Sequence, residues 1–144
     1  MNKELFIKGP VTPDLISKIL NEQSTDRESG AFTIFLGQVR SDKIDGKEVT
    51  AIEYTAYESM AEKVFEVIRK DTFESFKLTK IIIIHSLGTV KSGEVSLFVL
   101  VAAGHRPDVF KDCSYIVEKI KKDLPVWGKE ILEDDSYTWK KNNF

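Results

Sequence analysis

The sequence predicts an α+β fold, a largely antiparallel sheet covered by helices, formed as a single domain over residues 1–144. Apolar residues recur at helical spacing in some segments and fill extended runs in others, so both kinds of element are expected. The length suits one hydrophobic core, and no repeat, low-complexity tract or linker divides the chain. This mixture is typical of helices packed on one side of an antiparallel sheet.

The first third of the chain contains two predicted strands around a short helix. Residues 3–8 form a strand, and residues 13–21 form a helix, because Thr12 suits the N-cap and Pro13 suits the first helical position. A polar stretch then leads to an apolar strand over residues 31–40.

The middle third contains a charged loop, a strand and an amphipathic helix. Residues 41–47 are charged and contain a glycine, which predicts a surface loop. Residues 48–56 form the next strand. The helix covers residues 58–74 and has four apolar residues at helical spacing on one face: Met60, Val64, Val67 and Ile68.

The last part of the chain contains two strongly apolar strands, a long helix and a closing strand. The two strands are joined around Gly88 and Gly93, and their continuous apolar runs indicate a place in the middle of a covered sheet. The tail KKNNF is expected to fray unless a partner orders it. The four elements cover residues 78–86, 94–103, 107–122 and 126–132.

The composition excludes several classes of function. The formal net charge is −2 and the pI is about 5.8, whereas a nucleic-acid-binding protein would show a basic excess. The first residues lack the apolar core of a signal peptide, and the longest apolar run, Leu97 to Ala103, is far shorter than the ~20 residues that span a bilayer. The single cysteine, Cys113, excludes an internal disulfide. We therefore expect a soluble, cytoplasmic protein without nucleic-acid or membrane partners.

Two candidate anion-binding positions lie at the ends of predicted strands. His105 and Arg106 precede Pro107 at a strand-to-helix junction, where unpaired N–H groups and the helix dipole attract anions. Arg40 ends a strand in which Gly37 lets a neighbouring backbone or a ligand come close, and its planar guanidinium suits phosphate or carboxylate. Taken alone, each pattern also fits basic residues solvated at the surface.

A third candidate, Lys121, is placed by the geometry of the long helix. It lies roughly 80° from the centre of the apolar stripe of that helix. Partial burial would lower the pKa of its amine and suit it for acid–base or nucleophilic chemistry. A lysine that only extends from the edge of the stripe into solvent gives the same pattern. The stripe consists of Val109, Phe110, Cys113, Ile116, Val117 and Ile120.

The remaining residues offer no further chemistry. Cys113 is expected to be a buried small hydrophobe, and His85, at the end of an isoleucine run, is expected to be structural. The sequence contains no spacing typical of a metal site, no Gly-rich phosphate loop, no dinucleotide fingerprint and no nucleophile elbow. From the residues alone, the prediction is an α+β domain with an anion pocket.

Five segments together resemble one family, the large subunit of molybdopterin synthase. They follow the family's order and cover most of residues 30–130, which makes the resemblance specific. The segments are GAFTIFLGQVR (30–40), EYTAYESMAEK (53–63), IHSLGTVKSGE (84–94), GHRPDVF (104–110) and IKKDLPVWGKE (120–130).

This resemblance implies an α/β hammerhead-type fold and a homodimer within a heterotetramer, with a small ubiquitin-like sulfur-carrier subunit docked at each end. The C-terminal thiocarboxylate of that subunit would enter a pocket of the large subunit. Two sulfurs would pass to cyclic pyranopterin monophosphate and form the dithiolene of molybdopterin, in molybdenum cofactor biosynthesis. Because the sulfur arrives with the partner, the resemblance implies no cofactor and no metal in this chain.

Matched residue by residue, the resemblance implies a catalytic role for Lys121 in proton transfer. The family's second lysine usually follows the aromatic residue, where this chain has Gly128. Lys129 is the candidate for that second role, although in a regular strand it would face the opposite side. The implied substrate-binding set is Gln38, Val39, Arg40, His105, Arg106, Lys121, Gly128, Lys129 and Glu130.

Smaller departures from the family are Thr55, where an acidic residue is usual, and Ser86, where an arginine is usual. The family's dimers complete each pocket with residues of the other protomer, and Lys140 and Lys141 are candidates for that contribution. Two other hypotheses remain open. One is a non-catalytic relative that binds the pterin or the small subunit, which Gly128 favours. The other is a general phosphate-ester enzyme, for which metal ligands and a nucleophile are lacking.

Overall fold

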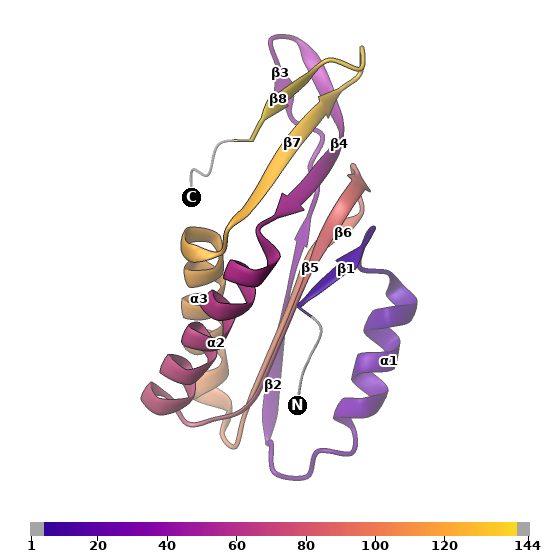
Figure 1. Ribbon diagram of the computed structural model, residues 1–144. Helices are drawn as coiled ribbons and strands as arrows, with labels where there is room; N and C mark the ends of the chain where they lie inside the picture. Colours follow the sequence, from indigo (N-terminus) through magenta and orange to yellow (C-terminus); the bar gives the residue numbers. More distant parts are fainter. Residues whose placement is uncertain (1–4, 141–144) are drawn as a thin grey trace.

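The computed structural model describes residues 5–140, which form an open, mostly antiparallel eight-stranded sheet with three helices (Figure 1). The predicted α+β class is confirmed. No helix of this described part is long and apolar enough to cross a membrane. In chain order the elements are β1 (Phe6–Lys8), α1 (Pro13–Gln23), β2 (Ala31–Gln38), β3 (Lys43–Ile44), β4 (Lys47–Ala56), α2 (Glu58–Ser75), β5 (Leu78–Lys91), β6 (Val95–Ala103), α3 (Arg106–Asp123), β7 (Val126–Leu132) and β8 (Tyr137–Trp139).

Strands β5 and β6 lie in the middle of the sheet, and helices cover both of its faces. The strand order is β2-β6-β5-β4-β7-β8, with β1 parallel to β5 and β3 paired with β4. Because side chains alternate along a strand, Ile83 and Val99 pack with α2 and α3, while Ile84 and Phe98 pack with α1 on the other face. Figure 1 shows α1 across the sheet from the two longer helices. The covered central strands are confirmed, and the expected placement of the helices on one side is wrong.

The strands β4, β7 and β8 extend the sheet beyond the helices, toward the top of Figure 1. Strand β5 joins the two parts, because residues 78–85 pair with β6 and residues 88–91 pair with β4. Gly88, where the second pairing begins, has φ +82°, a conformation that favours glycine. A small separate core stabilises this second part and consists of Val39, Val49, Ile52, Val90 and Leu132.

The longer reach of β5 is the main difference from the predicted strand boundaries. The strand predicted over residues 78–86 continues to Lys91, because its second half gains β4 as a partner. The loop predicted over residues 41–47 contains β3, which turns back into β4 through Asp45 and Gly46, both at positive φ.

Two strand ends also differ from the prediction. The strand predicted over residues 31–40 ends at Gln38, where the pairing with β6 shifts. Strand β8, absent from the prediction, pairs with β7 shortly before the tail that was expected to fray. The first residues of the predicted strand 3–8 and the last four of the tail lie outside the described residues.

The two long helices bury faces that differ slightly from the predicted ones. In α2, Met60 and Val67 are 47% and 64% exposed, because the helix is turned so that Ala61 and Phe65 enter the core. In α3, Phe110 is 62% exposed at the edge of the predicted stripe. The other stripe residues are buried as predicted: Val109, Cys113, Ile116, Val117 and Ile120.

The close approach of Gly30 to the end of β6 provides a test of the fold. A Cβ atom at Gly30 would collide with the carbonyl oxygen of Gly104, and a backbone atom cannot turn away. We expect Gly30→Ala to lower the free energy of unfolding by about 1–3 kcal/mol, measured by denaturant titration. The matched control is Gly104→Ala, whose Cβ would meet only the carbonyl oxygen of Glu28 at 3.9 Å. Equal effects of the two variants would contradict this account.

Candidate anion-binding pocket

A pocket of about 340 Å³ lies where the two parts of the sheet meet the C-terminal end of α3. Its wall combines residues that are far apart in the sequence, because β2, β4, β5, β6 and β7 all reach this point. Arg40, Lys121 and Lys140 bring positive charge to the wall, and Asp42 and Glu130 bring carboxylates.

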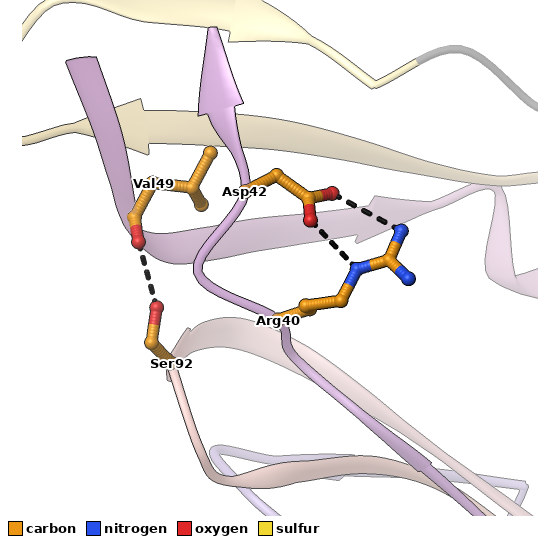
Figure 2. Close-up of polar contacts among 4 residues, drawn as sticks. All are labelled: Arg40, Asp42, Val49 and Ser92. Atoms are coloured by element: carbon orange, nitrogen blue, oxygen red, sulfur yellow. Dashed lines mark hydrogen bonds and ion pairs between the residues drawn. The ribbon is translucent and has the colours of Figure 1, made fainter. Parts of the chain in front are cut away.

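Arg40 lies between β2 and β3 and is paired with Asp42 (Figure 2). Its Nε donates to Oδ1 of Asp42 at 2.6 Å and its Nη2 donates to Oδ2 at 3.3 Å. The Arg40 side chain is 82% exposed, so water screens this pair strongly. A guanidinium carries five N–H donors, and Asp42 accepts from two, so three can donate to an anion in the pocket.

The backbone beside this arginine is fixed by the turn between β5 and β6. The N–H of Val39 donates to the carbonyl of Glu94 at 2.9 Å, and the carbonyl of Val39 accepts from the N–H of Gly93 at 2.8 Å. The same turn is tied to β4 by Ser92, whose hydroxyl donates to the carbonyl of Val49 at 2.8 Å (Figure 2). Val39 itself is buried, so it contributes to the pocket as a fixed part of the wall.

Gly37 and Gln38 mark the place where β2 leaves β6. A Cβ atom at Gly37 would lie 3.3 Å from Cβ of Leu97, so the glycine lets the neighbouring strand β6 come close to β2. The side-chain amide of Gln38 donates to the carbonyl of Gly93 at 2.8 Å. Gln38 therefore lines the pocket while its amide nitrogen holds the turn in place.

Lys121 reaches the pocket wall from the last turns of α3. The predicted partial removal from water is confirmed: burial lowers the pKa of the Lys121 amine, and the charge of Lys140 lowers it further. The carboxylate of Glu118 acts in the opposite direction. A lysine whose pKa is lowered gives up its proton more readily near neutral pH, which suits proton transfer.

Strand β7 divides its side chains between the pocket and the opposite face of the sheet. Gly128 and Glu130 line the pocket, whereas Lys129 points away from it. The amine of Lys129 lies 3.2 Å from Oε1 of Glu53 and 4.6 Å from the centre of the Tyr137 ring. The prediction that Lys129 lines the pocket is therefore corrected. The pairing of β7 with β4 is regular at this position, so no bulge turns the side chain back.

The inner wall of the pocket holds polar side chains that the sequence did not identify as functional. The hydroxyl of Tyr54 donates to Oγ of Ser96 at 3.1 Å, and the Tyr54 ring meets His85 edge-on at 5.1 Å. Nδ1 of His85 lies 2.8 Å from the carbonyl oxygen of Ser86. Because a carbonyl only accepts, Nδ1 carries the proton and Nε2 is left as an acceptor. The sequence gives little indication of a functional role for Tyr54, His85 or Ser96, because each is a single polar side chain within a strand.

Burial controls the ionisation of both aromatic groups. It lowers the pKa of His85, with a smaller effect from the charge of Lys121, and it raises the pKa of Tyr54. Both side chains are therefore neutral near pH 7. Among the described residues, no group of three or more His, Cys, Asp or Glu side chains is placed to hold a metal ion.

His105 and Arg106 lie at the other end of α3 and are exposed. His105 is the N-cap residue, and its side chain makes no capping hydrogen bond. The helix places Arg106 about 22 Å from Lys121 along its axis. The structure therefore brings Arg40 and Lys121 together in one pocket and leaves His105 and Arg106 outside it.

The sequence matches known proteins over most of its length. Residues 10–123 match the family model described as MoaE protein. A molybdopterin synthase catalytic subunit of Dictyostelium discoideum is 38% identical over 150 residues, covering 99% of this chain and 92% of that one. The corresponding subunit of Pyrococcus abyssi is 36% identical over 109 residues, covering 76% and 73%. That of Oryza sativa subsp. indica is 36% identical and covers 81% of this chain, which spans only 60% of the rice protein.

Solved structures share the fold. Molybdopterin synthase from Staphylococcus aureus superposes with a TM-score of 0.83 at 27% identity, covering 98% of both chains. A complex of subunits 1 and 2 of molybdopterin-converting factor from Helicobacter pylori gives a TM-score of 0.78 at 22% identity. It covers 94% of this chain and 88% of that one, and at this identity it supports the fold alone.

The open sheet, with its cation-lined pocket beside the end of a long helix, defines an α+β protein whose pocket has the size and charge to suit a small anion. The family model and the relatives identify the chain more narrowly: it belongs to the MoaE protein family. The resemblance carried by the five sequence segments is thereby confirmed.

His85 should make the stability of the chain depend on pH. Its pKa is lowered in the folded chain, so the unfolded chain, at about 6.5, takes up the proton first as the pH falls. The stability from neutral His85 is present above about pH 6.5 and is lost below it. The variant His85→Phe keeps a ring against Tyr54 but cannot take up a proton. Between about pH 7.5 and about pH 5.5, we expect the free energy of unfolding to fall less in this variant than in the wild type. Urea titrations at both pH values measure this, and equal falls would contradict it.

Proposed function

We propose that this chain acts in the cytoplasm as the catalytic subunit of molybdopterin synthase, a sulfurtransferase. It would accept sulfur from the C-terminal thiocarboxylate of a small ubiquitin-like subunit and transfer it to cyclic pyranopterin monophosphate, forming the dithiolene of molybdopterin. The proposal is supported by relatives named molybdopterin synthase catalytic subunit and by the shared fold with the Staphylococcus aureus enzyme.

The observation that carries this proposal is the group of cations around one pocket. Arg40, Lys121 and Lys140 come from three separate segments of a chain whose net charge is −2, and in the pocket wall these three cations outnumber the two carboxylates, Asp42 and Glu130. The pocket volume of about 340 Å³ is at the lower end of the roughly 300–1,000 Å³ typical of small-molecule sites. Size and charge together suit the monophosphate of a fused-ring heterocycle.

Lys121 is the proposed catalytic residue. Sulfur transfer forms a carbon–sulfur bond at an oxygen-bearing carbon of the pterin, from which that oxygen leaves. Water then attacks the acyl carbon of the carrier, so that the bond between sulfur and the acyl carbon breaks, the carrier ends in a carboxylate and the sulfur stays on the pterin. Negative charge develops on the reacting groups as these bonds change. An amine of lowered pKa can donate a proton to the oxygen that leaves the pterin, and its cationic form stabilises the negative charge that develops there. In this proposal Arg40 holds the phosphate, while Gly128 and Glu130 belong to the wall that encloses the pterin.

His105 and Arg106 remain proposed binding residues, but in the pocket of a second copy of the chain. Arg106 and Lys121 lie at opposite ends of the rigid helix α3, about 22 Å apart, so they cannot both contact one small substrate in the same chain. Arg106 of one chain and Lys121 of a second chain can contact the same substrate if the two chains pair so that the start of each α3 lies at the pocket of the partner chain. We therefore propose a homodimer, which becomes a heterotetramer when one small subunit docks at each pocket.

Sulfur transfer itself provides the first test of this function. The purified chain is mixed with thiocarboxylated small subunit and cyclic pyranopterin monophosphate, and dithiolene formation is followed. Lys121→Ala should lose about 10²–10⁴-fold in turnover, as expected for loss of an acid–base group. Lys129→Ala, on the opposite face of β7, should keep wild-type turnover. Absence of turnover by the wild-type chain would favour a non-catalytic scaffold, and normal turnover by Lys121→Ala would remove that residue from catalysis.

A pocket shared between two subunits predicts complementation. Arg106→Ala and Lys121→Ala are each expected to be inactive alone. When the two variants are co-expressed, half of the dimers are mixed, and each mixed dimer has one pocket with both native residues. Turnover should therefore recover to roughly a quarter of the wild-type value. No recovery, or full activity of Arg106→Ala alone, would show that Arg106 does not serve the partner's pocket.

A further inference from the structure

Lys140 reaches the pocket because of a glycine in another strand. It follows β8, and its backbone N–H donates to the carbonyl of Gly128 in β7 at 2.7 Å. A Cβ atom at Gly128 would lie 3.6 Å from Cβ of Lys140. Any longer side chain at Gly128 would extend from this point and compete with the aliphatic part of Lys140 for the same space.

The other near neighbours of Gly128 restrict the directions that a side chain could take. A Cβ atom there would already lie 3.0 Å from Cγ2 of Ile52 and 3.5 Å from Cε1 of Tyr54. A side chain at Gly128 would therefore have to extend into the cavity that Gly128 and Lys140 both line, where it would compete with the Lys140 side chain for space. Glycine at the one position and lysine at the other fit together in this pocket.

Lys140 and Lys121 face the same cavity from different elements. Burial is the main cause of the lowered pKa of Lys121, repulsion by Lys140 lowers this pKa further, and Glu118 acts against both. Of the two carboxylates in the wall, Asp42 is paired with Arg40, and Glu130 lines the same cavity as the two lysines, so the three cations of the wall exceed its carboxylates by one. Two ammonium groups around one cavity repel each other when only water lies between them, and an anion that lies between them stabilises both. This arrangement is therefore suited to binding rather than to stability.

We propose that Lys140, together with Lys121, binds the same phosphate of the substrate that Arg40 holds, and that Gly128 admits Lys140 to the pocket. The sequence assigned Lys140 to the pocket of the other protomer, but the geometry assigns it to the pocket of its own chain. The inference rests on the proposed function only for the identity of the substrate. Lys121, Lys140 and the space beside Gly128 form an anion-binding site that does not depend on which reaction the protein catalyses.

Binding measurements test this site without catalysis. Two probes are titrated separately into the purified chain, cyclic pyranopterin monophosphate by calorimetry and inorganic phosphate by ³¹P NMR. Lys140→Ala should weaken both affinities roughly ten- to hundredfold, as expected for loss of a charged hydrogen-bond donor, and Lys140→Arg should retain most of the affinity. The matched control is Lys129→Ala, a lysine on the opposite face of the same strands, which should bind as the wild type does. Unchanged affinity in Lys140→Ala, or no binding of either probe to the wild type, would overturn the proposal.

A second readout distinguishes binding from a merely structural role. The pKa of Lys121, followed by NMR of ¹³C-methylated lysines, should rise in Lys140→Ala because a neighbouring positive charge is removed. Removal of Lys140 leaves Glu118, His85 and the other charged groups of the pocket wall in place. The change in the pKa of Lys121 therefore measures the interaction between Lys121 and Lys140. An unchanged pKa would show that the two amines do not share a cavity and would overturn the proposal.

The role of Gly128 is tested by filling its space. Gly128→Leu should weaken binding of both probes as much as Lys140→Ala does, with the thermal unfolding midpoint recorded to confirm folding. Wild-type affinity in a folded Gly128→Leu would refute the claim that this glycine admits Lys140. Failure of the wild type in sulfur transfer, with the binding results as expected, refutes the proposed function and leaves the anion site. Normal sulfur transfer by Lys140→Ala refutes this inference alone.

Discussion

The hydrogen bonding of β5 is the constraint on which the pocket depends. This strand pairs with β6 as far as His85 and with β4 from Gly88 onward, so a single backbone belongs to both parts of the sheet. The inner wall of the pocket lies at this change of partner, where Tyr54 and Ser96, from the two neighbouring strands, come within hydrogen-bonding distance. The positive φ of Gly88 allows β5 to pass from one partner to the other without breaking.

The alternation of side chains along a strand then determines which residues line the pocket. In β7, Gly128 and Glu130 face the cavity, and Lys129 between them pairs with Glu53 on the outer face. A lysine one position along the chain is therefore on the wrong side of the sheet, however close it is in sequence. Lys140, which is remote in sequence, is brought to the correct side by the pairing of β8 with β7.

Local features were predictable from the sequence, and features that depend on distant pairing were not. The first helix follows from Thr12 and Pro13, and the partial burial of Lys121 follows from helical periodicity, because both depend on neighbours within a few residues. The extension of β5, the short strand β8 and the pocket position of Lys140 depend on strands that meet only in the folded chain. The family resemblance identified Arg40 and Lys121, but it grouped them with residues that one chain keeps far apart.

Helix α3 therefore serves as a rigid spacer as well as a cover for the sheet. Its buried stripe, which includes Ile116 and Ile120, fixes the helix on the core, so the separation between Arg106 and Lys121 cannot change without loss of that packing. A second chain can bring the two ends into one site, whereas bending within one chain cannot. The fold also fixes the positions of the cations that line the pocket. Strand pairing brings Arg40 and Lys140 to the pocket and α3 brings Lys121, so that three cations face two carboxylates and the excess of positive charge suits an anion.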